Sequence, residues 1–348
     1  KYPKNFFLAL LRASKNDPDP RESIEQVAQE LEHFKIKLLP PDINKSELDF
    51  SIEGDNIRFG ISSIKGIGQE NLEKFSSFKN KYGNKFQKFQ SLKKTKISIG
   101  VVSSLIQSGA VPEFKDKRSF GVLEAQLWGL LNEKERDACL LYGKENDFAL
   151  IKTIKFLETK NNEKGKPIIS ARRLATIRKK YALYREIYEK NRENEKFANW
   201  FYEKKLMGYS SGVTLKEIFS EKHHNLVTIS EALAYSGNDP IKFVGQVQEK
   251  YLGTSKKGDK YLRLSVKDDG GMISCLAFKD AIDEIKTING EKLPAEDNIV
   301  IVHGRRKNDA IFIDHISIQD SKIYIKLGEL RDEKKEKDEE EAKNITPH

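Results

Sequence analysis

The sequence predicts an α+β protein of several domains, with a helical region first, a helical connector next and a five-stranded β-barrel last. Two observations predict this order. Apolar residues recur every three or four positions through most of residues 118–222, as in helices, whereas five short runs between residues 240 and 318 alternate as strands do. A chain of 348 residues is also long enough to bury more than one core.

Composition narrows the class of protein. The formal net charge of +9 and the pI of about 9.1 suit an anionic partner such as nucleic acid or a membrane surface. Cys139 and Cys275 stand far apart, without a CxxC motif or clustered histidines, so we expect a reducing compartment and neither a zinc site nor a disulfide framework. No apolar run approaches membrane-spanning length and the first residues do not form a signal peptide, so we expect a cytoplasmic protein with no membrane partner. Because the chain begins with Lys1, we expect a piece of a longer polypeptide.

Two helices and a hairpin are predicted at the N-terminal end. Residues 2–15 have helical spacing, and after "NDPDPRE" either Asp17 or Asp19 can cap a second helix with Pro20 in its first turn. The apolar face of that helix carries Ile24, Val27, Ala28, Leu31 and Phe34. The prolines of "LLPPDIN" then exclude a helix, and "LDFSIE" and "NIRFG" alternate around "GDN" as the strands of a hairpin do.

The turn "IKGIG", residues 64–68, is the first candidate binding site. Gly66 and Gly68 allow backbone conformations and a close approach that a Cβ atom would block. The amides after the turn lie at the N-terminus of the amphipathic segment "QENLEKF", where unpaired N–H groups and the helix dipole favour an anion such as a DNA phosphate. Ile64 and Ile67 would anchor the turn in the core. The pattern predicts a helix-hairpin-helix whose DNA-binding residues are Lys65, Gly66, Ile67, Gly68 and Gln69, and a purely structural turn is the alternative.

A second unit of the same kind, "FQSLKKTKISIGVVSSLIQSGAV", makes the pair a weak internal duplication. It lacks the double glycine and keeps only Gly100. We therefore expect this unit to have a structural role. Its lysines, Lys93, Lys94 and Lys96, are candidates to contact a second phosphate, and an ordinary solvated lysine cluster is the alternative.

A basic helix and a set of strands follow. Residues 172–208 are charged and free of proline and glycine until Gly208, which predicts one long surface helix laced by salt bridges. Five strand-like runs then begin at "PIKFVGQVQEKYLG", and a helical segment, "DAIDEIKTING", lies between the third and fourth. This is the layout of an OB-fold barrel, and a five-stranded sandwich fragment is the alternative. The mixed-charge end of the chain predicts a disordered tail.

Two loops of the barrel make the second candidate site. The loops join the first two strands and the last two, and in an OB-fold they flank the face that binds oligonucleotides. Their basic residues are Lys256, Lys257, Lys260, Arg305, Arg306 and Lys307. Inward-facing Leu262, Leu264 and Val266 send Tyr261 and Arg263 outward, where the tyrosine can stack on a base and the arginine can contact the backbone or a π-face. Ordinary polar loops are the alternative.

The sequence contains no recognisable catalytic site. It has no Walker loop, GxSxG or HExxH motif, and no carboxylate cluster of the kind that two-metal phosphoryl transfer needs. Asp268 and Asp269 precede two glycines, which is typical of a turn. His303 and His315 lie in strands, where we expect structural roles. No catalytic residue and no metal ligand is therefore predicted.

Several segments together resemble the C-terminal half of bacterial family C replicative DNA polymerases, the alpha subunit of DNA polymerase III. They are "YPKNFFLALL", "LLPPDINKSELDFSIEGDNIRFGISSIKGIG", "SLIQSGAV" and "LGTSKKGDKYLRLSVKDDGGMISCLAFKDAID". The resemblance runs discontinuously over residues 2–111 and 200–318. It implies the end of the polymerase fingers in residues 1–50, a tandem helix-hairpin-helix domain in 51–117, a helical connector in 118–236, an OB-fold domain in 237–328 and a charged tail in 329–348.

The resemblance also implies a function. The chain would hold primer–template DNA through its hairpins and single-stranded template through its barrel, as part of a DNA-directed DNA polymerase, a nucleotidyltransferase. The catalytic aspartates and their Mg²⁺ would lie in a palm domain outside this chain, which itself would hold no cofactor, and a sliding clamp would be a further partner. Two alternatives remain open, a stand-alone DNA-binding or repair scaffold and a helical protein–protein adaptor.

The sequence departs from the family in two places. "GYSSGVTLKEI" keeps a Ser-Gly pair but has Val213 and Thr214 where the family has His-Pro. The charged tail stands where the family has a further domain that binds the tau subunit of the clamp loader. These departures favour a divergent or phage-encoded member.

Overall fold

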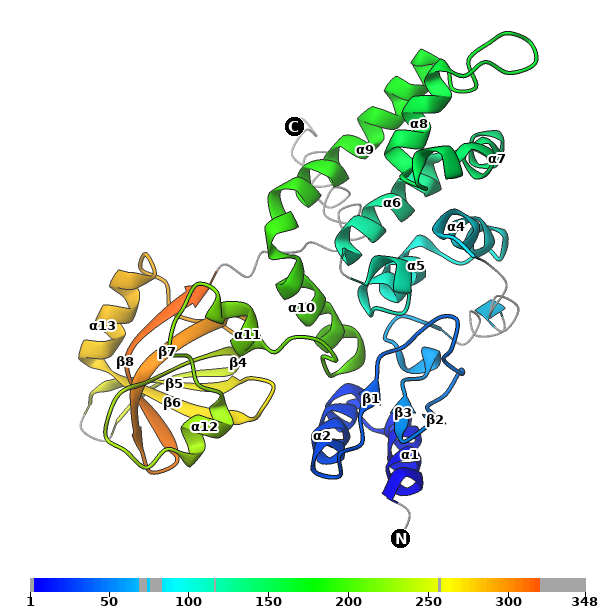
Figure 1. The fold of residues 1–348 in the computed structure, drawn as a ribbon. Coiled ribbons are helices and arrows are strands. Elements are labelled where there is room, and N and C mark those ends of the chain that lie inside the picture. The colour runs from blue at the N-terminus through cyan, green and yellow to red at the C-terminus, as the bar shows by residue number, and fades with distance from the viewer. Residues whose placement is uncertain (1–2, 69–73, 76–82, 116, 256–257, 320–348) are drawn as a thin grey trace, which may run out of the picture. The chain divides into compact units, whose positions relative to one another are not determined.

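The computed structural model describes residues 3–68, 74–75, 83–115, 117–255 and 258–319. The chain divides after Ser211 into two compact units, a helical unit in residues 1–211 and a barrel unit in residues 212–323 (Figure 1). The predicted fold class, a helical region followed by a five-stranded OB-type barrel, is confirmed. Within the described residues, no helix has both the length and the apolar composition needed to cross a membrane.

The N-terminal elements form as predicted. Helix α1 (Pro3–Ala13) leads through a 3₁₀ turn (Ser14–Asn16) to α2 (Pro20–His33). Asp19 caps α2, because its carboxylate accepts hydrogen bonds from the amides of Arg21 and Glu22 at 3.0 and 3.4 Å. On the predicted apolar face Ile24 and Leu31 are fully buried, but Phe34 is 53% exposed because α2 ends before it.

A three-stranded sheet follows. Strands β2 (Ser51–Glu53) and β3 (Asn56–Arg58) form the predicted antiparallel hairpin, with Gly54 in the left-handed region (φ +61°) at its turn. The short strand β1 (Leu38–Leu39) adds parallel to β3, a pairing that local alternation does not reveal.

Most of the remaining described residues of this unit are in helices. They are α4 (Lys85–Lys94), α5 (Ile99–Gln107), α6 (Arg118–Leu130), α7 (Glu133–Tyr142), α8 (Leu150–Thr159), α9 (Ala171–Asn191) and α10 (Glu195–Met207), with 3₁₀ turns at Ile61–Ser63, Pro112–Phe114, Lys144–Asn146 and Arg192–Asn194. The single long helix expected over 172–208 is wrong, because the last of these turns separates α9 from α10. The break lets Glu195, at the start of α10, accept a hydrogen bond from the Ser119 amide of α6 at 2.8 Å.

A buried ion pair connects several of these helices. The guanidinium of Arg118, at the start of α6, lies 2.6 Å from the carboxylate of Glu203 on α10, and both side chains are almost fully buried. Arg118 also donates to the carbonyl oxygen of Gln107 at the end of α5, at 3.0 Å. The other oxygen of Glu203 accepts hydrogen bonds from the Ser210 hydroxyl and the Ser211 amide. Each of the two buried charged groups therefore has its opposite charge and further hydrogen-bond partners.

The second unit is a closed barrel. Its strands are β4 (Ile241–Thr254), β5 (Lys260–Lys267), β6 (Met272–Phe278), β7 (Ile299–Lys307) and β8 (Ala310–Gln319), in the order β4-β5-β6-β8-β7. Only the β6–β8 pair is parallel. Helix α13 (Lys279–Ile288) lies between the third and fourth strands as predicted, and this strand order is that of an OB-fold.

The barrel unit begins earlier than the boundary expected at residue 237. Helices α11 (Leu215–Ser220) and α12 (Ile229–Ala234) pack against β4, so residues 212–236 belong to this unit rather than to the helical connector. The Asp268–Asp269 turn holds them there. Asp268 accepts from the Ile229 amide and Asp269 from the Leu215 amide, each at 2.7 Å. Thr214, which replaces an expected proline, caps α11 through the Glu217 amide.

Replacing Glu203 by alanine should destabilise the helical unit by about 3–5 kcal/mol, because Arg118 would stay buried without its counter-charge. Both tryptophans of the chain, Trp128 and Trp200, are buried in this unit, so tryptophan fluorescence during urea unfolding reports it alone. Asp55→Asn, which removes the exposed Lys4–Asp55 pair, is the matched control and should leave the transition unchanged. Equal transitions for the two variants would contradict the role given to the buried pair.

Candidate nucleic-acid interface

The Lys65–Gly68 turn combines a buried anchor with an exposed backbone. Ile64 and Ile67 are buried in the core of the helical unit, whereas Lys65, Gly66 and Gly68 are exposed. Gly66 has φ +86°, a conformation that side chains disfavour. A Cβ atom there would meet only the Ser104 hydroxyl, at 3.6 Å, so the requirement for glycine comes from the backbone angle and not from crowding.

Not every amide of the turn is available to a ligand. The Lys65 amide donates to the Leu206 carbonyl oxygen at 2.9 Å, and the Ile67 amide donates to the Ile64 carbonyl oxygen at 3.2 Å. In the described part of the chain, the amides of Gly66 and Gly68 make no hydrogen bond. Gln69, predicted as the next contact, lies outside the described residues, as does most of the "QENLEKF" segment. The two glycine amides are thus the groups that can meet an anion.

The second hairpin joins α4 to α5. Lys93, Lys94 and Lys96 are all exposed around this turn, and Lys96 itself has φ +57°. Ser98 caps α5 by accepting a hydrogen bond from the Val101 amide, so this helix start is already satisfied in part by the protein. The structure therefore puts the three lysines together at one turn without the free glycine backbone of the first hairpin.

Strand β5 shows the predicted alternation. Leu262, Leu264 and Val266 are fully buried in the barrel, and Arg263 is exposed on the other side, with Tyr261 half-buried beside it. The Arg263 guanidinium carbon lies 5.6 Å from the centre of the Tyr251 ring on β4, and the rings of Tyr251 and Tyr261 are 5.9 Å apart. A stacked arginine next to two tyrosines is the kind of surface on which an unpaired base can stack.

This surface continues over the third and fifth strands, with two rings that were not among the predicted site residues. Phe278 on β6 is 46% exposed and lies opposite Tyr261 in the ladder, and its ring stacks on that of Phe312 of β8, with centres 5.8 Å apart. Tyr251, Tyr261, Phe278 and Phe312, with Arg263 and Lys307, form what we call the aromatic face. The signal that could have found the two phenylalanines is the period of two, because inward-facing Ala277 and Ile311 force their neighbours outward.

A hollow opens beside the aromatic face. Its volume is about 450 Å³, and its lining includes Leu276, Phe278 and Phe312 as well as Asp259 from the β4–β5 connection. The connection between the first two strands therefore reaches the same hollow as the last strand. The described loop between β7 and β8 does not line this hollow, so the convergence of the two basic loops stays a prediction.

The basic loop residues differ in what they contact. Lys260 is exposed, and the Lys307 ammonium lies 4.9 Å from the centre of the Phe312 ring. Arg305 is exposed and pairs loosely with Asp314 at 3.7 Å. Arg306 instead donates to two backbone carbonyl oxygens, those of Tyr235 and Asn308. Lys256 and Lys257 lie outside the described residues.

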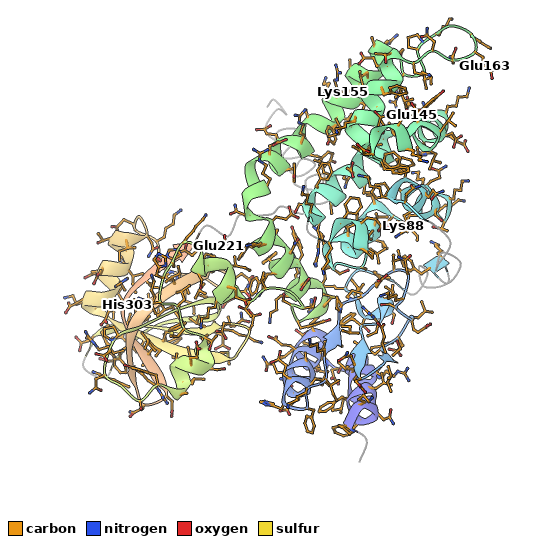
Figure 2. The ribbon with its side chains drawn as sticks, viewed as in Figure 1. Lys88, Glu145, Lys155, Glu163, Glu221 and His303 are labelled. Atoms are coloured by element: carbon orange, nitrogen blue, oxygen red, sulfur yellow. The ribbon has the colours of Figure 1, made fainter. Side chains whose placement is uncertain are left out.

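Two histidines of the barrel lie against each other. His303 and His315 face each other across β7 and β8, with ring centres 4.5 Å apart (His303 is labelled in Figure 2). Burial, and after it the neighbouring His315, lowers the pKa of His303, so this ring is neutral at physiological pH. Among the described residues, no cluster of three or more histidine, cysteine, aspartate or glutamate side chains could hold a metal ion.

Comparison with known proteins supports both the motif and the resemblance. A family model described as "Helix-hairpin-helix motif" matches residues 35–120. The DNA polymerase III subunit alpha of Aquifex aeolicus is 25% identical over 312 residues, which are 87% of this chain and 22% of that protein. The Escherichia coli K12 subunit is 24% identical over 309 residues, 87% of this chain and 24% of that protein. That of Deinococcus radiodurans is 32% identical over 129 residues, 33% of this chain and 9% of that protein.

The similarity to DNA polymerase III alpha subunits therefore extends over most of the chain, and the resemblance noted from the sequence is confirmed. The chain spans less than a quarter of the length of these relatives. Among solved structures, the mitochondrial single-stranded DNA-binding protein Rim1 of S. cerevisiae is 13% identical, with a TM-score of 0.20, over 24% of this chain and 96% of that one. At that score the fold assignment of the barrel rests on its own strand order.

Replacing Phe278 or Tyr261 by alanine should weaken binding of single-stranded DNA more than binding of duplex, by about 1–3 kcal/mol for each base that loses its stacking partner. Fluorescence anisotropy with a labelled oligonucleotide and with its duplex measures both affinities. Ile288→Ala is the matched control, because Ile288 is an equally exposed apolar residue of the same unit and is not part of the aromatic face. Equal losses on both substrates would rule out stacking on this face.

Proposed function

We propose that this chain is the DNA-holding part of a DNA-directed DNA polymerase. Its helix-hairpin-helix unit holds the duplex of a primer–template, and its barrel holds the single-stranded template. The similarity to DNA polymerase III alpha subunits over most of the chain supports this proposal. Because the chain corresponds to less than a quarter of those proteins, the polymerase activity is proposed for the longer polypeptide and not for this piece.

The observation that carries the proposal is the geometry of the Lys65–Gly68 turn. Buried Ile64 and Ile67 fix the turn, and the exposed backbone presents the amide of Gly66 between them and that of Gly68 just after them. The Lys65 side chain is exposed at the same turn. A phosphate oxygen accepts hydrogen bonds from such amides and gains from a nearby ammonium charge. No base edge is needed for this contact, so the binding is independent of sequence, as duplex-holding in replication requires.

The barrel suits the single strand for a different reason. Residues 212–323 contain 16 lysines and arginines and 17 aspartates and glutamates, a net charge of −1. Attraction between the whole unit and a polyanion is therefore weak, and affinity must come from local contacts. The aromatic face supplies them, because every base has a π-face that can stack on an exposed ring.

The chemistry of nucleotide transfer is proposed to lie outside this chain. Two-metal phosphoryl transfer needs a group of carboxylates around Mg²⁺. The described residues offer no such group. This chain would then position the substrate, and a palm domain elsewhere in the polypeptide would hold the metal ions.

The full-length product of the gene should extend a primer in the presence of Mg²⁺. This experiment separates the proposal from its alternative, a stand-alone DNA-binding or repair scaffold. A full-length product that binds DNA and transfers no nucleotide would favour the scaffold. A chain that shows no salt-dependent affinity for DNA would exclude both.

Lys65→Ala should reduce the salt dependence of duplex binding by one phosphate contact, a change of roughly 0.9 in the slope of log affinity against log salt concentration. Gly66→Ala should weaken binding further, since an alanine at φ +86° strains the turn by about 1–2 kcal/mol. Lys37→Ala, which removes an exposed lysine elsewhere in the helical unit, is the control. If the Lys65 and Lys37 variants have the same slope as the wild-type chain, the turn is not the phosphate site.

A further inference from the structure

Most of the net positive charge of the chain lies in a segment that belongs to neither candidate site. The segment from the start of α8 to the end of α9, residues 150–191, contains twelve lysines and arginines and four glutamates, a net charge of +8. The other 306 residues contain 50 basic and 49 acidic residues. Helices α8 and α9 lie side by side and are joined by a loop (Figure 1), so this charge is concentrated on one helical hairpin.

Most of these cations have no counter-charge among the described residues. Arg173 pairs with the buried Glu135, Arg178 lies 3.6 Å from Glu158, and Arg185 lies 3.9 Å from Glu189. Eight others are exposed and pair with no carboxylate among the described residues. One of these, Lys160, lies over the rings of Tyr142 and Phe156, which leaves seven. We call these seven the α8–α9 basic surface: Lys152, Lys155, Lys164, Lys166, Arg172, Lys179 and Lys180.

This surface differs from an ordinary solvated helix. From Ala171 to Tyr184, α9 has five cations and no carboxylate, so the lacing by salt bridges expected from its composition is confined to its C-terminal end. Its first turn holds Arg172 and no acidic residue, although the N-terminus of a helix favours negative charge. Such an arrangement is unfavourable for the isolated helix and becomes favourable when an anion lies against it.

The chemistry of the surface indicates which anion. None of the large apolar side chains exposed in the described structure lies between residues 150 and 191. A protein partner needs apolar or aromatic anchors at the centre of its interface, and a single strand needs rings on which its bases stack. A phosphate backbone needs neither, because the release of its counter-ions by lysine and arginine supplies the affinity.

We propose that the α8–α9 basic surface binds the sugar-phosphate backbone of duplex nucleic acid, independently of its sequence, as a contact separate from the Lys65–Gly68 turn. The proposal rests on the proposed function, because the same helical unit carries the turn that would hold the duplex. Helix α9 has 21 residues and is about 32 Å long, which matches the axial length of about nine base pairs. Figure 2 labels Lys155, which lies on α8, and Glu163, which lies in the loop between α8 and α9. Glu163 is the one acidic residue of that loop.

The test compares two variants of equal charge. One carries Lys152→Gln, Lys155→Gln, Arg172→Gln and Lys179→Gln on the α8–α9 basic surface. The control carries Lys37→Gln, Lys45→Gln, Lys222→Gln and Lys292→Gln, four exposed lysines elsewhere that have no ion pair in the described structure. Circular dichroism establishes that both are folded, and anisotropy with a labelled duplex gives the slope of log affinity against log salt concentration.

The α8–α9 variant should lose roughly 0.9 in slope for each lost phosphate contact, or about 2–4 in total, while the control keeps the slope of the wild-type chain. Equal losses in both variants would overturn the proposal, since net charge alone would then explain the effect. An unchanged slope in the α8–α9 variant, with a steep wild-type slope that Lys65→Ala reduces, would overturn it and leave the proposed function standing. A wild-type chain without duplex affinity would overturn both. Polyglutamate serves as an acidic-protein probe, and loss of polyglutamate binding alone would assign the surface to a protein partner instead.

Discussion

The helical unit depends on the buried pair between Arg118 and Glu203. Two charges in a core are unfavourable unless each is paired and hydrogen-bonded, and here the carbonyl oxygen of Gln107 and the Ser210–Ser211 segment complete the set. The pair thereby joins α5, α6, α10 and the segment that leaves the unit. The position of Arg118 also gives a reason for the glycine at position 109. Gly109 has φ +82°, and a Cβ atom there would lie 2.7 Å from the Arg118 guanidinium. Two segments of the family resemblance, "SGAV" and "YSSG", thus both lie against the Arg118–Glu203 pair.

The same helix connects this cluster to the candidate phosphate site. Glu203 and Leu206 lie within one turn of each other on α10, which ends at Met207. The last carbonyl groups of a helix have no partner within it, and the Leu206 oxygen accepts the Lys65 amide. The bond satisfies two backbone groups and sets the path of the chain into the turn. The Leu206 carbonyl oxygen of α10 binds the Lys65 amide, and the Ile64 carbonyl oxygen binds the Ile67 amide. The amides of Gly66 and Gly68 are the ones that remain exposed at the turn.

Local signals in the sequence revealed local structure well. The cap at Asp19, the "GDN" hairpin, the inward residues of β5 and the helix between the third and fourth strands all depend on short-range chemistry, and the structure has them. What the sequence did not reveal depends on contacts between distant segments. The break at Arg192–Asn194 has no proline or glycine to mark it. Phe278 and Phe312 are in contact because β6 and β8, which are distant in the sequence, pair in the barrel. The barrel unit begins at Gly212 because Asp268 and Asp269 accept hydrogen bonds from the first amides of α12 and α11.

The distribution of charge separates two ways of holding the same polymer. Residues 1–211 contain 40 basic and 28 acidic residues, a net charge of +12, whereas the barrel unit has a net charge of −1 and an exposed set of rings. Charge acts on the regularly spaced phosphates of a duplex without regard to sequence, and its effect falls steeply as salt rises. Stacking acts on unpaired bases, because every base has a π-face that a ring can cover once the base has left the duplex. On the proposed function, the two units therefore distinguish paired from unpaired template by physical mechanism, and the basic composition of the chain is a property of the duplex-holding unit alone.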